Sequence, residues 1–226
     1  MEIAGLQKMP LLDYPGRIAC TVFLSGCNLR CPFCHNASLV LRPQAALSQA
    51  DLLAFLETRK RKLDGVCVTG GEPTLYKDLP QLLAAIKALG FLVKLDTNGT
   101  RPQVLRDLLA ANLLDYVAMD IKNSPAKYAA TCGGAEVLDA VRECAACLEE
   151  SAVDHEFRTT VLHPFHTPGD LAAIGQWLRG TKRYFIQQFV DSGDLIGSGT
   201  ALTGEELQAL LAAVKPHIPN AQLRGV

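Results

Sequence analysis

Short apolar runs alternate with segments of helical length along the chain. Two of the helical segments begin with capping boxes, at Ser48 with Asp51 and at Thr203 with Glu206. The segments of strand length cover residues 18–24, 65–69, 91–95, 116–119, 155–161 and 184–189. The predicted helices cover residues 48–59, 79–89, 103–111, 137–150, 170–178 and 203–214. This alternation predicts an α/β fold with a parallel sheet and right-handed crossovers, in one domain over residues 1–226.

The first apolar run lies between a turn and a loop. Pro15 and Gly16 give residues 11–16 the composition of a turn, which leads into residues 18–24. That run is apolar enough to be buried on both faces of a sheet. The loop after it then lies at the C-terminal end of a strand, the edge at which barrel enzymes carry their chemistry. The rhythm by itself fits an open barrel and a flat, doubly wound sheet equally well.

Composition narrows the class of protein. The chain has 226 residues, of which 49% are hydrophobic, enough for one sizeable core. Its formal net charge of −1 offers no basic excess for nucleic acid or an anionic membrane. We find no secretory pattern at the start and no apolar run of membrane-spanning length, so we expect a soluble cytoplasmic protein. Eight cysteines in such a chain indicate metal or redox chemistry rather than disulfides.

Three cysteines stand close together in the loop after the first strand: Cys27, Cys31 and Cys34. A soft metal centre binds thiolates and neutralises the charge that would otherwise drive them apart. Closed zinc sites and ordinary iron–sulfur clusters have four protein ligands, so three leave one coordination position open for chemistry. A structural zinc site, with His35 or a distant cysteine as the fourth ligand, is the alternative, although Cys34 and His35 are adjacent and can hardly both reach one tetrahedral metal.

Polar motifs follow the later predicted strands. Their members are Gly70, Gly71 and Glu72, then Asp96 and Asn98, then Asp120 and Lys122, then Arg158, and last Gln187 and Gln188. Glycines allow a close backbone approach to a ligand, a glutamate accepts a hydrogen bond from an ammonium, and an arginine pairs with a carboxylate. Each motif taken alone is also compatible with an ordinary turn or a surface ion pair.

The cysteine loop, with Phe33 directly before its last cysteine, resembles the signature of the radical S-adenosylmethionine (SAM) family. The resemblance implies that the three thiolates hold a 4Fe–4S cluster, whose fourth iron is bound by the amino and carboxylate groups of the methionine part of SAM. It favours the partial, open (β/α)6 barrel, similar to a TIM barrel, over the flat sheet. The short segment between Cys34 and Gly70 implies a single cluster.

The other motifs resemble segments of glycyl-radical activating enzymes. The resemblance implies that Gly70, Gly71 and Glu72 contact the SAM amino group and that Lys122 and Arg158 contact its carboxylate. It implies that Asp96 and Asp120 ligate a monovalent cation or line the substrate site together with Asn98. Gln188 is the candidate for adenine or ribose, although Phe189 and Val190 stand where such enzymes often carry a histidine. His163 and His166 are weaker candidates.

The whole pattern, including Asp13-Tyr14-Pro15-Gly16, most resembles activators of anaerobic ribonucleoside-triphosphate reductase. This implies an oxidoreductase that cleaves SAM reductively and generates a glycyl radical on that partner, with electrons from a flavodoxin or ferredoxin. One alternative is a radical SAM enzyme that acts on a small molecule or peptide, such as a 7-carboxy-7-deazaguanine synthase. The other is a zinc or thiol module without catalysis.

The remaining cysteines have a simpler interpretation. Cys20 and Cys67 lie inside apolar runs and are expected to be packing residues. Cys144 and Cys147 are three apart on one predicted helix and so share a face, where they could join Cys132 at a second metal or act as a redox pair. Packing is the favoured interpretation of all three, because no fourth ligand is evident.

Overall fold

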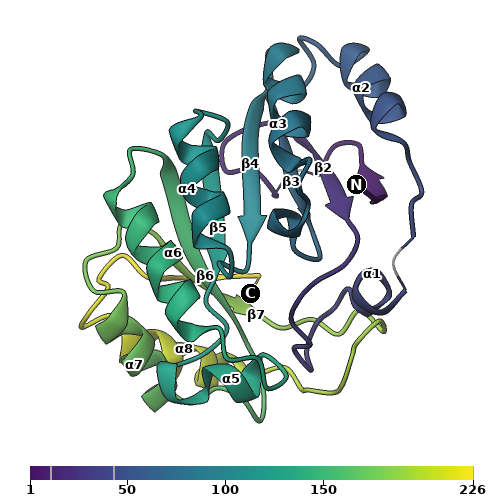
Figure 1. Cartoon of the computed structure of the whole chain (residues 1–226). Helices are drawn as coiled ribbons and strands as arrows, with labels where there is room; N and C mark the ends of the chain where they lie inside the picture. Colours follow the sequence, from purple (N-terminus) through teal and green to yellow (C-terminus); the bar gives the residue numbers. More distant parts are fainter. Residues whose placement is uncertain (11, 43, 226) are drawn as a thin grey trace.

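The strands of the computed structural model, which describes residues 1–10, 12–42 and 44–225, form one curved sheet in sequence order (Figure 1). Only β1 and β2 are antiparallel, and every later neighbour is parallel. Leu11, the first residue of the predicted turn, lies outside the described residues. The strands are β1 (Ile3–Gln7), β2 (Ala19–Leu24), β3 (Gly65–Gly70), β4 (Leu92–Thr97), β5 (Tyr116–Asp120), β6 (Asp154–Val161), β7 (Tyr184–Gln188) and β8 (Gln222–Arg224).

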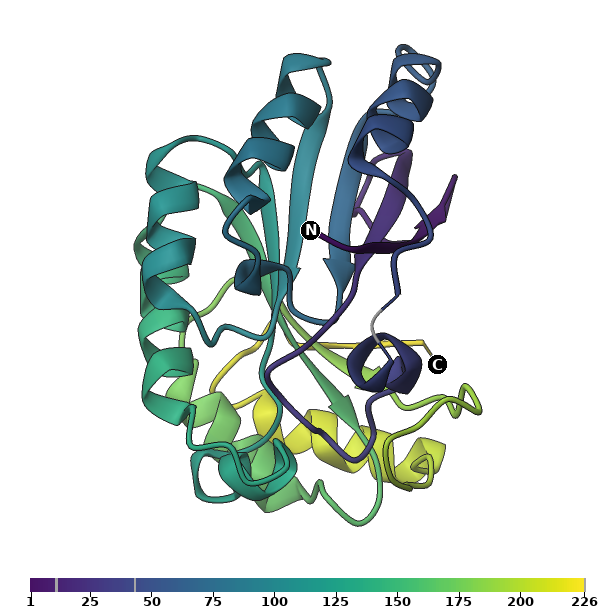
Figure 2. The ribbon, with the colours of Figure 1, turned by 45° about the vertical axis from the view of Figure 1, so that its right-hand side comes forward.

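The strand order separates the two architectures that the rhythm left open. In a flat, doubly wound sheet the order reverses at a switch point, whereas here each strand pairs with the next one in sequence. Right-handed crossovers then place successive helices on the same face. Figures 1 and 2 show the larger helices on the outer face of the sheet. The predicted open barrel is confirmed: β2–β7 are the six predicted parallel strands, the short β8 adds a seventh at one edge, and the antiparallel β1 extends the other edge.

The helices follow the predicted rhythm. The capping boxes at Ser48 and Thr203 are confirmed, and a third, between Thr167 and Asp170, begins α7 two residues earlier than predicted. None of the helices in the described ranges is long and apolar enough to cross a membrane. The helices are α1 (Ala37–Leu41), α2 (Gln49–Glu57), α3 (Leu79–Ala88), α4 (Pro102–Ala110), α5 (Tyr128–Thr131), α6 (Leu138–Glu150), α7 (Pro168–Trp177) and α8 (Gly204–Val214), with 3₁₀ turns η1 (Pro73–Leu75) and η2 (Pro125–Lys127).

The two faces of the sheet differ in polarity. On β4, Val93 and Leu95 are buried in the apolar core that the helices share with the sheet. Lys94 and Asp96 alternate with them and therefore project toward the barrel interior. Register carries this polarity across the sheet, because Lys94 pairs with Cys67 on β3 and Asp120 on β5 pairs with Arg158 on β6. The barrel thus has an apolar outer layer and a charged interior.

Candidate active site

A cavity of about 530 Å³ opens at the C-terminal ends of the parallel strands. Its walls come from the loop after β2 and from the ends of β3–β7. Every predicted site residue except Glu72 and the two weaker histidine candidates lines it, namely Cys27, Cys31, Phe33, Cys34, Gly70, Gly71, Asp96, Asn98, Asp120, Lys122, Arg158 and Gln188. The structure therefore brings residues from six separate stretches of sequence to one place.

The cysteine loop forms one wall of this cavity. Cys31 is buried, whereas Cys27 and Cys34 are half-buried. The Cys27 sulfur accepts hydrogen bonds from the Leu29 backbone N–H at 3.4 Å and from the Asn98 side-chain amide at 3.7 Å. In the described ranges, no three His, Cys, Asp or Glu side chains converge on one point as ligands of a single metal ion.

The pKa values of the three thiols differ in the direction of their shifts. Burial raises the pKa of Cys27 to about 11 and raises that of Cys34 as well. A hydrogen bond with the Cys132 thiol lowers the pKa of Cys31 to about 7, against the effect of burial. Thiolates are the form that binds metal, and a cationic centre supplies the charge that favours them. The donor set thus fits an iron–sulfur cluster on three cysteines of one wall.

Glu72 is the exception among the predicted residues, since its carboxylate is fully buried and directed away from the cavity. It accepts hydrogen bonds from the backbone N–H and hydroxyl of Thr74, at 3.1 and 2.5 Å. It also accepts from the Thr97 hydroxyl at 2.8 Å and the Asn98 backbone N–H at 2.6 Å. Three of these donors meet Oε1, and the Asn98 N–H meets Oε2. Glu72 therefore connects η1 to the end of β4, and only the glycines of its motif face the cavity.

Close packing against β2 and the loop after it requires glycine at positions 70 and 71. Gly70 has a φ of +119°, and a Cβ there would lie 2.3 Å from the Leu24 carbonyl oxygen. A Cβ at Gly71 would lie 1.8 Å from the carbonyl oxygen of Gly26, the residue before Cys27. Only glycine fits at such separations. The glycine pair therefore fixes the end of β3 directly against the base of the cysteine loop.

An ion-pair network lies across the cavity from the cysteines. Arg158 donates from Nε to Asp120 at 2.5 Å and from Nη2 to Asp96 at 3.0 Å. Lys122 donates to the other oxygen of Asp120 at 2.8 Å, and Lys94 pairs with Asp96. Burial opposes ionisation of both aspartates, but Arg158 and the two lysines outweigh it and lower their pKa values. Burial likewise opposes the charged form of Lys122, and Asp120 outweighs it and raises the pKa.

Gln188 carries a polar atom without a partner. Its side-chain nitrogen donates to the Leu202 carbonyl at 2.8 Å, which fixes the amide in place. Its buried Oε1 has no hydrogen-bond partner among the described residues. A buried acceptor in the wall of a cavity that lacks a partner is suited to a ligand N–H.

The two candidate histidines lie outside this wall. His166 is buried and its Nε2 lies 2.9 Å from the Lys122 carbonyl oxygen, so it supports the segment that carries Lys122. His163 pairs with Glu206 at the start of α8, with 3.0 Å between Nε2 and the carboxylate. Neither histidine lines the cavity, and a role for them in ligand binding stays a prediction.

Several residues of the site were not predicted from the sequence. Gln7, Thr69 and Thr160 also line the cavity, as does Gln187, which was predicted together with Gln188. The strict alternation of Val93, Lys94, Leu95 and Asp96 is the signal that would have placed Lys94 inside a barrel. Cys132 was considered only with Cys144 and Cys147, which lie on α6, whereas the structure places it against Cys31. Its contact with Cys31 was not visible from spacing.

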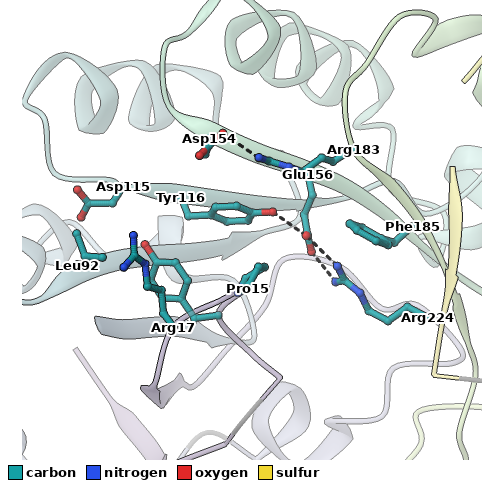
Figure 3. Close-up of a pocket in the computed structure, with 11 residues that line it drawn as sticks. Pro15, Arg17, Leu92, Asp115, Tyr116, Asp154, Glu156, Arg183, Phe185 and Arg224 are labelled. Atoms are coloured by element: carbon teal, nitrogen blue, oxygen red, sulfur yellow. Dashed lines mark hydrogen bonds and ion pairs between the residues drawn. The ribbon is translucent and has the colours of Figure 1, made fainter. Parts of the chain in front are cut away.

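A second cavity, of about 340 Å³, lies at the opposite end of the barrel (Figure 3). Its central carboxylate, Glu156, accepts two hydrogen bonds from Arg224 and one from the Tyr116 hydroxyl. Arg183 pairs with Asp154 at its rim, at 2.9 Å. No cysteine or histidine lines this cavity. Its main charges are already compensated, so the cavity beside the cysteines is the candidate active site.

Comparison with known proteins yields one family and several full-length or partial relatives. A model of the Radical SAM superfamily matches residues 21–178. A protein of Methanocaldococcus jannaschii, provisionally named a glycyl-radical enzyme activating enzyme, is 31% identical over 99% of this chain and 96% of its own length. The 7-carboxy-7-deazaguanine synthase of Thermococcus kodakarensis is 32% identical over 50% of this chain and 52% of its own length.

Solved structures share the fold. Streptococcus suis SuiB superposes with a TM-score of 0.72 at 17% identity, over 91% of this chain and 48% of SuiB. The chain therefore spans about half the length of that structure. A radical SAM methyltransferase from Sphaerobacter thermophilus has a TM-score of 0.71 at 14% identity, over 93% of this chain and 67% of the other.

Proposed function

The chain belongs to the Radical SAM superfamily, and from this premise we propose that it is an activating enzyme that removes a hydrogen atom from a backbone glycine of a partner enzyme. The observation that carries this proposal is the end-to-end similarity to an activating enzyme, in a chain whose three cysteines line a cavity beside the open edge of the barrel. The candidate partner is anaerobic ribonucleoside-triphosphate reductase, with a flavodoxin or ferredoxin as electron donor.

Members of the superfamily use a 4Fe–4S cluster and SAM, which together supply a 5′-deoxyadenosyl radical. In this chain Cys27, Cys31 and Cys34 would hold the cluster. Hydrogen bonds from Leu29 and Asn98 to the Cys27 sulfur stabilise that residue as a thiolate. The remaining residues of the cavity have the tasks of binding SAM, orienting it and keeping water away from the radical.

The ion-pair network is suited to the carboxylate of SAM. Three cationic side chains, Lys94, Lys122 and Arg158, meet two carboxylates, so the network carries one net positive charge. Nη1 of Arg158 has no hydrogen bond to any described residue and is available to a ligand, as are the unused N–H groups of Lys122. At the far wall, Oε1 of Gln188 can accept from the adenine amino group. The backbone around Gly70 and Gly71 then remains to bind the ammonium group of SAM.

The position of the cavity mouth supports a polypeptide substrate. The sheet ends at β1 and β8, which leaves one side of the barrel unclosed. The cavity wall includes Gln7 on β1 and Gln187 on β7, so it reaches toward that side. Val190, which also lines the cavity, is 70% exposed and offers an apolar contact at the mouth. A glycine-bearing loop of a partner could enter there.

A second candidate function rests on the partial similarity to 7-carboxy-7-deazaguanine synthases. On that alternative the cavity holds a small heterocycle rather than a peptide loop.

One experiment separates the two candidates. The reconstituted protein is mixed anaerobically with SAM, a reductant and anaerobic ribonucleotide reductase, and electron paramagnetic resonance then detects any glycyl radical. The proposal predicts a radical on the reductase that is absent with the Cys34→Ala variant. SAM cleavage that never yields a protein radical, together with turnover of a pterin-type substrate to a deazapurine, would establish the alternative instead.

A further inference from the structure

Lys94 is a buried charge directly beneath the candidate active site. Its side chain is 2% exposed, and it lies below the cavity floor rather than in its wall. It pairs with Oδ1 of Asp96, and its ammonium lies 3.7 Å from the Cys67 sulfur. Lysine is almost never fully buried without a partner, because removing its ammonium from water is unfavourable. A lysine in this position therefore calls for an explanation in terms of Asp96.

The four carboxylate oxygens of the network are shared among the three cationic groups without overlap. Asp120 receives Arg158 on one oxygen and Lys122 on the other. Asp96 receives Arg158 on Oδ2 and Lys94 on Oδ1. The other groups on Asp96 are neutral: the Thr69 hydroxyl at 3.3 Å and the Cys67 thiol at 3.6 Å. Lys94 is thus the only charged donor to Oδ1 of Asp96 in the described part of the chain.

We propose that Lys94 is a positioning residue, a covalently attached cation that fixes Asp96 and, through it, the orientation of Arg158 toward the SAM carboxylate. Without Lys94, two neighbouring carboxylates would share Arg158 and Lys122, and the network would have no net positive charge. Asp96 would then have an uncompensated oxygen in a cavity open to solvent ions. Because the ammonium occupies the place beside Oδ1 of Asp96, that carboxylate needs no dissociable cation there. This inference rests on the proposed binding of SAM in the cavity.

The test replaces the ammonium with an uncharged group of similar length. In Lys94→Met we expect SAM affinity to fall about tenfold in buffer whose only monovalent cation is choline. Potassium or ammonium at millimolar concentration should restore most of it, by occupying the vacated place beside Asp96. The wild-type protein should bind SAM equally well in choline and in potassium. Lys87→Met is the matched control, because Lys87 pairs with Asp115 away from the cavity, and it should behave as wild type.

A second readout does not depend on the cluster or on SAM. Thermal unfolding of the cluster-free protein should show a potassium-dependent rise in Tm for Lys94→Met, and none beyond general salt effects for the wild type and Lys87→Met. This arm still tests Lys94 if the wild type proves not to bind SAM, a result that would refute the proposed function separately.

Two results would overturn the inference. One is a wild-type protein that requires potassium for SAM binding. The other is a Lys94→Met variant whose SAM affinity and Tm respond to cations as the wild type does. If Lys94→Met does not fold, the comparison of choline with potassium in the wild type, and the retention of SAM binding in Lys94→Arg, decide the question.

Discussion

Buried carboxylates inside this barrel fall into two kinds according to their donors. Asp96, Asp120 and Glu156 accept from lysine or arginine, and these cations outweigh burial and lower the pKa. Glu72 accepts only from hydroxyl and backbone N–H groups, and burial prevails and raises its pKa. The charged pairs lie in the cavity or at the opposite end of the barrel, whereas Glu72 connects η1 to the end of β4.

Glu156 gives a pH-dependent prediction. Burial raises its pKa, but the hydrogen bonds from Arg224 outweigh this and lower it below its usual value of about 4.3. A lowered pKa means that the carboxylate stabilises the fold above about pH 4.3 and loses this contribution as pH falls through the folded-state pKa. Removing the pair in Glu156→Gln should cost about 3 kcal/mol at pH 7, because Arg224 loses its partner.

The measurement is the free energy of unfolding from urea titrations between pH 7 and pH 3. We expect the wild type to lose stability more steeply than Glu156→Gln over the acidic part of this range. The exposed control Glu57→Gln should follow the wild type. Equal slopes for the wild type and Glu156→Gln would show that the pair with Arg224 contributes nothing to stability.

At the scale of elements, the close approach of β3 to the cysteine loop organises the site. Gly71→Ala would place a methyl group 1.8 Å from the Gly26 carbonyl oxygen, so one of the two segments must move. We expect a loss of about 2 kcal/mol or more in stability and a lower iron content after reconstitution. Gly204→Ala at the start of α8 meets nothing within 4 Å and should be neutral or slightly stabilising. An iron content in Gly71→Ala equal to that of the wild type would contradict the account.

The sequence predicted the central elements well and the edges poorly. β2, β3 and β5 are mainly apolar runs, and two capping boxes marked helix starts correctly, because burial and local hydrogen bonds leave clear patterns. β1 and β8 were missed because they are short edge strands with partly exposed side chains. The short helices α1 and α5 hold too few residues to show a helical period. Such elements form through contacts that are distant in sequence.

The site was predictable where polar motifs stand at the ends of predicted strands. Strand-end motifs converge on one cavity because parallel strands share a C-terminal edge. Which side chain of a motif faces the cavity depends on local packing, and Glu72 does not line the cavity although its two glycines do. Lys94 was missed because a lysine inside an apolar strand was taken as part of the run, and the alternation across β4 was not considered.

At the scale of the whole molecule, the open barrel separates an apolar outer layer from a charged interior. The sequential strand order places all crossover helices outside and leaves a charged interior with two cavities, one at each end. The apolar outer layer supplies the stability, and the inner layer is free to carry charge. The fold is shared by proteins with different substrates, so the choice of substrate must come from the residues at the mouth of the cavity.

The most direct test of the account is SAM cleavage by the anaerobically reconstituted, reduced protein, followed as methionine and 5′-deoxyadenosine. We expect the wild type and Cys144→Ala to form both products in equal amounts, since Cys144 is buried on α6 away from the cavity. Cys31→Ala, which lacks one of the three thiols, should neither retain iron nor form either product. Cleavage by Cys31→Ala at the wild-type rate would contradict the assignment of the cluster to these three cysteines.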